Sequence, residues 1–185
     1  MRRIWLTGGS GSGKSTAANI FKKLGYEIVD CDKISWNIML PGHPAYEETI
    51  AAFGNEILNA DKTINRNLLG KIVFTNHEKL EILNAITHKY IIDEIEKSLA
   101  GEGKFVIDAP LPNRFGVKCD ITIVITAPIE TRINRLTKRD MIDEIYARNR
   151  IASQISDEEY KGLGVVIDNS GTPEELEEKI KAVIL

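Results

Sequence analysis

Cysteine is scarce in this sequence. The two cysteines, Cys31 and Cys119, belong to no C-x-x-C pair and have no pair of histidines nearby. This argues against a disulfide framework or a zinc site, and it favours two reduced thiols in a cytoplasmic protein. Long apolar runs are also missing: no stretch approaches the roughly 20 residues of a membrane span, and the apolar run after Arg3 is too short for a signal peptide. We therefore expect no membrane partner.

An excess of positive charge is absent as well. The 185 residues include 24 lysines and arginines against 27 acidic residues, which gives a formal net charge of −3. Because affinity for nucleic acid comes from clustered Lys and Arg, we expect no nucleic-acid partner. A chain of this length should bury roughly 70% of its unfolded surface, which is enough for a single domain. We expect that domain to span residues 1–185.

The most specific pattern that is present is G-x-x-x-x-G-K-S, from Gly8 to Ser15. It follows a short apolar run suited to a buried strand and precedes a stretch with helical spacing, which is the order that a phosphate-binding loop requires. In such a loop, backbone N–H groups surround the phosphates, Lys14 reaches the β- and γ-phosphates, and the Ser15 hydroxyl coordinates Mg²⁺. A Gly/Ser-rich turn without a ligand is the weaker alternative. The residues expected to contact ATP in this loop are Gly8, Gly9, Ser10, Gly11, Ser12, Gly13, Lys14, Ser15 and Thr16.

Apolar runs alternate with helical patterns along the chain, which predicts an α/β fold with a parallel sheet. The five expected strands are Arg3–Thr7, Glu27–Val29, Lys104–Ile107, Ile121–Thr126 and Val165–Ile167. Thr172 and Glu175 predict a capping box at the start of a last helix. Together with the phosphate loop, this indicates a three-layer fold of the P-loop NTPase type with a five-stranded parallel sheet.

Two segments interrupt the alternation. The segment from about residue 33 to residue 101 contains no convincing strand. It contains several helical stretches, namely Ala45–Phe53, Arg66–Phe74 and Leu80–Leu99. We interpret them as a helical substrate-binding insertion, with additional helical packing as the alternative. The segment from about residue 132 to residue 162 is rich in arginine, and Arg132, Arg135 and Arg139 share one helix face. They indicate either a lid that brings guanidinium groups to the transferring phosphoryl group, with Arg139 favoured, or a solvated, salt-bridged face.

Polar residues at strand ends are candidates for the chemistry. Asp32 follows the second strand and would serve as general base for an acceptor hydroxyl or, alternatively, as the N-cap of a helix. Asp108 ends the third strand, as a Walker B acid does, and would bind Mg²⁺ or brace the following loop through Pro110. Asn169 follows the fifth strand, where it would recognise adenine or simply form a turn. The sequence has no N-K-x-D motif, and Asp108 does not begin a D-x-x-G switch, so a small-molecule kinase is favoured over a GTPase.

An ordered series of motifs over nearly the whole length resembles the dephospho-CoA kinase family. The segments that carry the resemblance are Leu6–Thr16, Val29–Asp32, Asn65–Gly70, Ile72–Phe74, Leu83–His88, Asp108–Leu111, Arg135–Asp140, Arg150–Gln154 and Val166–Asn169. The resemblance implies transfer of the ATP γ-phosphoryl group to the ribose 3′-hydroxyl of dephospho-CoA, the last step of coenzyme A synthesis. It implies that Asp32 activates the acceptor, that the insertion binds CoA, that Arg139 belongs to the lid and that Asn169 approaches adenine. On the substrate side it further implies roles for His88, Asp108, Pro110 and Leu111.

The departures from the family pattern lie on the acceptor side. Trp36 stands where the family usually has Arg, Lys89 replaces a Pro, Arg114 lies in an apparently shortened loop, and Asp157 is near the usual place of a late Arg. An indole cannot replace a bidentate guanidinium, although it can stack on adenine, and Lys89 and Arg114 would restore positive charge. Two alternatives therefore stand beside dephospho-CoA kinase: a related nucleotide or nucleoside kinase, and a divergent ATP-binding paralogue without kinase activity.

Overall fold

The computed structural model describes residues 2–111 and 115–184. The chain divides into two compact units. The first, which we call the sheet unit, comprises Met1–Val29 and Gly101–Leu185, and the second, the helical unit, comprises Asp30–Ala100. Within the described part of the chain, no helix is long and apolar enough to cross a membrane.

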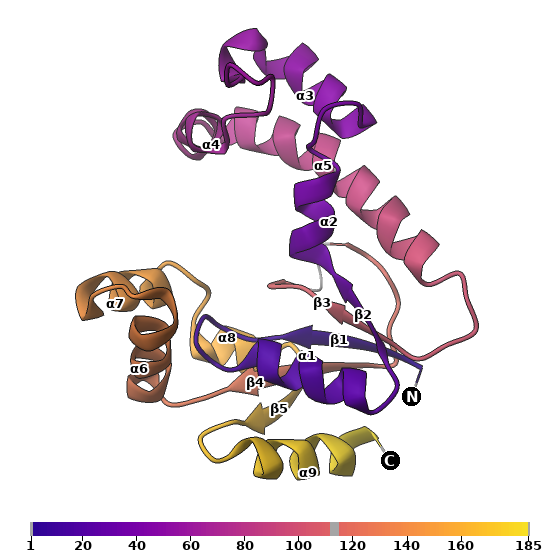
Figure 1. Cartoon of the computed structure of the whole chain (residues 1–185), viewed down its shortest axis with the longest axis vertical. Coiled ribbons are helices and arrows are strands. Elements are labelled where there is room, and N and C mark those ends of the chain that lie inside the picture. Colours follow the sequence, from indigo (N-terminus) through magenta and orange to yellow (C-terminus); the bar gives the residue numbers. More distant parts are fainter. Residues whose placement is uncertain (1, 112–114, 185) are drawn as a thin grey trace. The chain divides into compact units, whose positions relative to one another are not determined.

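A five-stranded sheet forms the centre of the sheet unit (Figure 1). Its strands are β1 (Arg3–Thr7), β2 (Glu27–Asp30), β3 (Phe105–Asp108), β4 (Ile121–Thr126) and β5 (Val165–Asp168), in the order β2-β3-β1-β4-β5. The central strand β1 pairs in parallel with both β3 and β4, so that Leu6 is in register with Asp108 on one side and with Ile123 on the other. The five predicted strands and the α/β class are confirmed, and the carboxyl ends of β1 and β3 meet at one edge of the sheet.

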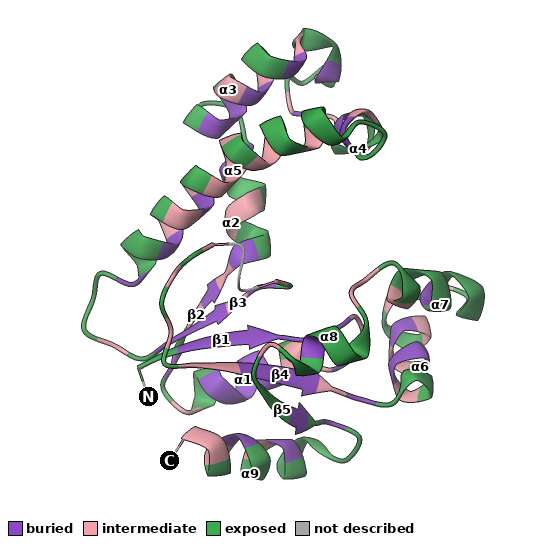
Figure 2. Ribbon diagram, turned by 180° about the vertical axis from the view of Figure 1, so that it is seen from behind, coloured by how far each residue is buried: buried purple, intermediate pink, exposed green. Residues whose placement is uncertain are grey.

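Burial of the strand residues explains why the sheet lies at the centre of this unit (Figure 2). Ile4 and Leu6 are fully buried and, because side chains alternate along a strand, they share one face of β1. On that face they belong to a core that includes Phe21 of α1 (Lys14–Lys23) and Leu176 and Ile180 of α9 (Pro173–Ile184). The predicted capping box of α9 is present, since Thr172 and Glu175 exchange hydrogen bonds of 3.2 and 3.3 Å.

Three further helices of the sheet unit follow β4 in the chain. They are α6 (Ile129–Asp140), α7 (Glu144–Ala152) and α8 (Asp157–Lys161). Helices α6 and α7 share a small apolar cluster of Ile133, Leu136 and Ala147. The same segment was predicted as the arginine-rich lid.

The helical unit contains α2 (Cys31–Asn37), α3 (Pro44–Phe53), the 3-10 helix η1 (Asn55–Ile57), α4 (Arg66–Phe74) and α5 (His77–Ser98). Helix α5 packs against α2, α3 and α4. It begins three residues earlier than its apolar spacing predicted, because the Asn76 side chain caps it by accepting a hydrogen bond of 3.1 Å from the Lys79 N–H. Among the described residues of this unit, the extended structure consists of the end of β2 and one antiparallel bridge between Leu58 and Ile64.

Candidate active site

The phosphate loop joins β1 to α1, and glycine is required at several of its positions. Gly8, Gly11 and Gly13 have φ angles of 150°, 77° and 96°, in a region that side chains rarely adopt. A Cβ atom on Gly8 would lie 2.3 Å from the Ile125 carbonyl oxygen, and one on Gly13 would lie 2.0 Å from Asn169 Nδ2. The neighbouring strands and loops therefore leave no room for side chains here.

The carbonyl groups of this loop accept hydrogen bonds from side chains outside it. Ser10 O accepts from Arg132 Nε at 2.9 Å, and Ser12 O accepts from Asn169 Nδ2 at 2.8 Å and from Arg135 Nη1 at 3.2 Å. The first N–H groups of α1 have no partner within the helix, and no side chain caps them. Free N–H groups at the positive end of a helix dipole make an anion site, so the loop fits a nucleotide phosphate group.

Lys14 and Asp108 form an ion pair beside this loop, and their side chains are 21% and 15% exposed. Lys14 begins α1 and Asp108 ends β3, so the parallel pairing of β1 with β3 brings the lysine and the acid together. Ser15 lies next to Lys14 in the first turn of α1 and is exposed. Its hydroxyl and the Asp108 carboxylate are oxygen donors of the kind that Mg²⁺ prefers, and the described residues contain no group of three or more His, Cys, Asp or Glu side chains that would hold a metal without substrate oxygens.

The three arginines of α6 have different surroundings. Arg132 is buried and its Nη1 donates to Asp157 Oδ1 at 2.6 Å, while Arg135 is half-buried and also donates to Asn169 O at 2.9 Å. Both contact the phosphate loop, so neither belongs to a solvated face. Arg139 is 55% exposed and pairs with Asp140, its neighbour in the chain, at 2.7 Å.

The pairing of Arg139 has an electrostatic consequence. Hydrogen bonds from Arg139, together with the charges of Arg139 and Arg150, lower the pKa of Asp140 to about 2. Arg150 Nη1 lies 2.8 Å from Asp140 Oδ2 and thereby links α7 to the end of α6. The expected action of Arg139 on the transferring phosphoryl group remains a prediction.

Asn169 and the segment after β3 support the loop. Asn169 is 5% exposed, and its backbone N–H donates to Thr126 O at 2.7 Å. Its adenine contact remains a prediction, because the bond that the structure gives its amide nitrogen goes to Ser12 O. The carbonyl of Pro110 accepts a bond of 2.7 Å from the Thr7 hydroxyl, and Leu111 next to it is half-buried.

Asp32 is exposed and lies in the first turn of α2. The alternative in which Asp32 caps this helix is wrong, because the cap is Asp30, which accepts a hydrogen bond of 3.0 Å from the Lys33 N–H. The Asp32 carboxylate is therefore not required to start the helix. His88 lies half-buried on α5 in the same unit.

Comparison with known proteins identifies the family. The family model described as dephospho-CoA kinase matches residues 2–175. The chain belongs to the dephospho-CoA kinase family. A dephospho-CoA kinase of Carboxydothermus hydrogenoformans is 41% identical in an alignment that covers 98% of this chain and 92% of that protein. A dephospho-CoA kinase structure from Campylobacter jejuni is 29% identical with a TM-score of 0.69, covering 100% of this chain and 96% of that one. The structure of TT1252 from Thermus thermophilus is 27% identical with a TM-score of 0.83, covering 99% and 96%.

Trp36, the first departure from the dephospho-CoA kinase pattern, is paired with an arginine. The Arg66 guanidinium lies 3.8 Å from the centroid of the indole, and its Nη2 donates to Trp36 O at 3.1 Å. Burial lowers the pKa of Arg66. Both residues line a pocket of about 610 Å³ within the helical unit, together with polar side chains that include Asn67. The lining of this pocket therefore includes an indole and a guanidinium.

The other departures have different outcomes. Lys89 does not supply an uncompensated positive charge, because its Nζ lies 2.6 Å from Glu48 Oε2. The pKa of Glu48 is lowered mainly by the hydrogen bond from Lys89 and, to a smaller extent, by the hydrogen bond from Tyr90. The expectation that Lys89 restores a missing charge stays a prediction, because a substrate phosphate would have to compete with Glu48 for its ammonium. Arg114 lies outside the described residues, and Asp157 pairs with Arg132.

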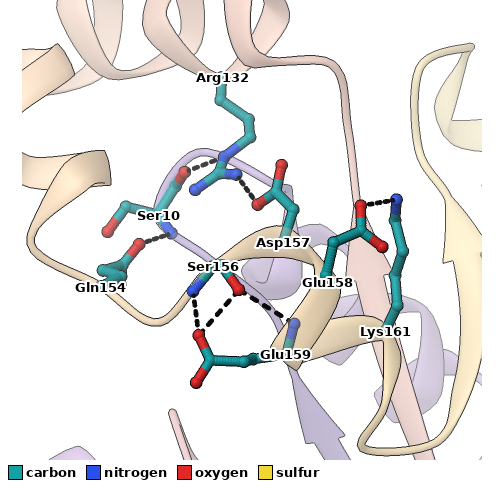
Figure 3. A network of polar contacts seen from close by, with 8 residues as sticks. All are labelled: Ser10, Arg132, Gln154, Ser156, Asp157, Glu158, Glu159 and Lys161. Carbon is teal, nitrogen blue, oxygen red and sulfur yellow. Dashed lines mark hydrogen bonds and ion pairs between the residues drawn. The ribbon is translucent and has the colours of Figure 1, made fainter.

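Sequence reasoning missed the roles of two residues, one that contacts the loop and one that contacts Arg132. Gln154 Oε1 accepts a bond of 2.7 Å from the Ser10 N–H, and Asp157 holds Arg132 from the other side (Figure 3). Gln154 ends one of the motifs that resemble the dephospho-CoA kinase family, which was its one signal in the sequence. Asp157 was noticed as a departure, but nothing in the sequence indicated its partner.

Proposed function

We propose that this chain is a dephospho-CoA kinase, which transfers the γ-phosphoryl group of ATP to the ribose 3′-hydroxyl of dephospho-CoA and releases ADP and coenzyme A. The observation that carries the proposal is the phosphate loop, whose carbonyls are bonded to Arg132, Arg135 and Asn169 while the N–H groups that begin α1 have no partner within the helix. Membership of the dephospho-CoA kinase family over residues 2–175 supports the choice of acceptor.

The proposed roles follow from the chemistry of the side chains. The N–H groups and Lys14 would bind the phosphates, which would compete with Asp108 for the lysine ammonium. Ser15 and Asp108 would hold Mg²⁺, which neutralises charge on the transferred phosphoryl group. Asp32 would accept the proton of the acceptor hydroxyl as general base, because its side chain is exposed and does not serve as the cap of α2. Arg139 would belong to a lid of about residues 132–162, and Asn169 would contact adenine.

We propose that the helical unit binds the acceptor. Dephospho-CoA carries an adenine ring and a diphosphate, and the pocket beside Trp36 presents an indole face and the Arg66 guanidinium. Aromatic faces stack on bases and guanidinium groups bind phosphates, so these residue types suit such a ligand. His88, Pro110 and Leu111 are further proposed contacts on the acceptor side. Because the same chemistry also suits other adenine nucleotides, the acceptor has to be determined directly.

A product analysis tests the proposal. The purified protein is incubated with Mg-ATP and, separately, dephospho-CoA, AMP, other nucleoside monophosphates and nucleosides, and the products are identified by mass spectrometry. Coenzyme A as the preferred product supports the proposal, whereas preferential phosphorylation of another acceptor identifies a related kinase. Binding of Mg-ATP without any product identifies a paralogue that lacks kinase activity. The Lys14→Ala variant is the control and should fail with every acceptor, because it lacks the phosphate-binding ammonium.

A further inference from the structure

The backbone of Ser10 is held from two directions by residues far along the chain (Figure 3). Its N–H donates to Gln154 Oε1 at 2.7 Å, and its carbonyl accepts from Arg132 Nε at 2.9 Å. Both backbone groups of Ser10 are therefore engaged with protein side chains. Although Ser10 belongs to the predicted phosphate-binding loop, its role here is to attach that loop to the segment that follows α6.

Arg132 is itself fixed by a second element. Its side chain is only 4% exposed, and its Nη1 is 2.6 Å from Asp157 Oδ1. Asp157 is the first residue of α8, a helix whose start is secured by a capping box between Ser156 and Glu159. A buried guanidinium requires a countercharge and hydrogen-bond partners, and Asp157 and Ser10 O provide them for Nη1 and Nε. The position of α8 therefore determines where Arg132 meets the phosphate loop.

Gly9 provides the space for this guanidinium. A Cβ atom on Gly9 would lie 2.4 Å from Arg132 Nη2, 3.0 Å from Arg132 Cζ and 3.4 Å from Gln154 Oε1. Gly9 is not among the glycines of the loop with a positive φ, so its backbone conformation would accept a side chain. What excludes a side chain at Gly9 is the Arg132 guanidinium.

We propose that Arg132 is a positioning residue for ATP. Arg132, Asp157 and Gln154 form a brace that sets the geometry of the phosphate loop through the Ser10 backbone, and Gly9 is glycine in order to admit this brace. The brace couples the affinity for ATP to α8 through residues whose observed bonds go to the loop backbone and to each other. This proposal extends the proposed function, and it rests on that function only for the identity of the nucleotide.

Removal of the guanidinium tests the brace. The variants are Arg132→Ala, Arg132→Lys and, as a matched control, Glu158→Gln, which breaks an ion pair of 3.0 Å with Lys161 on the same helix. The Kd for Mg-ATP is measured by calorimetry, and KM is measured separately for ATP and for dephospho-CoA. Loss of a charge-assisted hydrogen bond predicts that Arg132→Ala raises the Kd and KM for ATP on the order of tenfold, while the KM for dephospho-CoA stays within about twofold. Glu158→Gln should match the unsubstituted protein.

The lysine variant separates geometry from charge. A single ammonium lacks the fork that holds Ser10 O and Asp157 together, so Arg132→Lys should resemble Arg132→Ala. If Arg132→Lys instead binds Mg-ATP as the unsubstituted protein does, the charge alone matters and the proposal is overturned. Equal increases in KM for both substrates would indicate a general loss of structure and would also overturn it.

A double-mutant cycle with Gly9→Ala provides a test that does not depend on one variant. In the unsubstituted background the added methyl group displaces the guanidinium and should weaken Mg-ATP binding severalfold, by less than the order-of-tenfold loss from removing Arg132. In the Arg132→Ala background the obstacle is gone, so Gly9→Ala should change the Kd by less than about twofold. An equal loss in both backgrounds would mean that Gly9 faces the nucleotide itself, which would overturn the proposal. Calorimetry with Mg-ATP requires no acceptor, so these outcomes are independent of whether coenzyme A is the product.

Discussion

Replacing Gly13 with alanine tests how the phosphate loop is packed. Gly13 has a φ of 96°, and its missing Cβ would lie 2.0 Å from Asn169 Nδ2. Gly25 in the same unit is a matched control, because its φ is 83° and an added Cβ would meet nothing within 4 Å. The two substitutions therefore share the backbone cost and differ in the contact with Asn169.

The magnitudes follow from these two contributions. A left-handed conformation costs a residue with a side chain about 1–2 kcal/mol, and this cost applies to both Gly13→Ala and Gly25→Ala. Gly13→Ala also displaces the Asn169 amide, which is 5% exposed and donates to Ser12 O at 2.8 Å. Losing this bond and leaving a buried polar group without a partner costs about a further 1–3 kcal/mol. We expect Gly13→Ala to lower the free energy of unfolding by about 2 kcal/mol more than Gly25→Ala does.

Urea unfolding followed by circular dichroism measures the difference. With an m-value of about 2 kcal/mol/M, the midpoint for Gly13→Ala should lie about 1 M below that for Gly25→Ala. When Asn169→Ala is added to both variants, most of the difference between their midpoints should disappear, because the atom that the methyl group at position 13 meets is then absent. Equal midpoints for the two single variants would refute the reasoning, since they would show that Asn169 does not occupy the space beside Gly13.

Three other predictions concern separate groups. Asp32→Asn should keep the Kd for Mg-ATP while lowering kcat on the order of a hundredfold to ten-thousandfold, and unchanged turnover would remove Asp32 from the mechanism. The pKa of Asp140 is lowered from 3.8 to about 2, so its pairing with Arg139 stabilises the fold above pH 3.8 and loses that effect as the pH falls toward 2. The difference in stability between the unsubstituted protein and Asp140→Asn, measured by acid unfolding, should shrink over that range, and a constant difference would contradict it. Burial raises the pKa of Cys119 to about 12 and Cys31 is buried, so both thiols should react slowly with a disulfide reagent in native protein and rapidly in urea. Rapid reaction of the native protein at pH 8 would contradict this expectation.

Much of the fold could be predicted because its signals are local in the sequence. The apolar runs placed the strands, and Thr172 with Glu175 placed the start of α9. Local signals were ambiguous where two candidates stand close together. Asp30 and Asp32 both suit a helix cap, and the choice of Asp30 depends on its extended backbone, with φ −88° and ψ 102°, which places its side chain at the Lys33 N–H. The early start of α5 was missed because the Asn76 cap precedes the apolar pattern.

The candidate site was only partly predictable for a physical reason. Lys14, Ser15 and the glycines could be named because the chemistry of a phosphate loop depends on residues adjacent in the chain. The roles of the arginines could not, since Arg132 and Gln154 meet Ser10 across separations of 122 and 144 residues. Spacing predicted that the arginines of α6 share a face, but it carries no information about what that face contacts.

The sequence by itself therefore determined that this chain is an α/β protein with a nucleotide phosphate loop and a family-specific series of motifs. The reason is that the strand pattern, the loop chemistry and the helix caps each depend on residues that are neighbours in the chain. Only the tertiary structure decided that Arg132 and Arg135 support the loop from outside, that Lys89 is neutralised by Glu48 and that Gly9 makes room for a guanidinium. A buried or paired charge takes the partner that folding brings within hydrogen-bond distance, and that partner comes from a distant part of the chain.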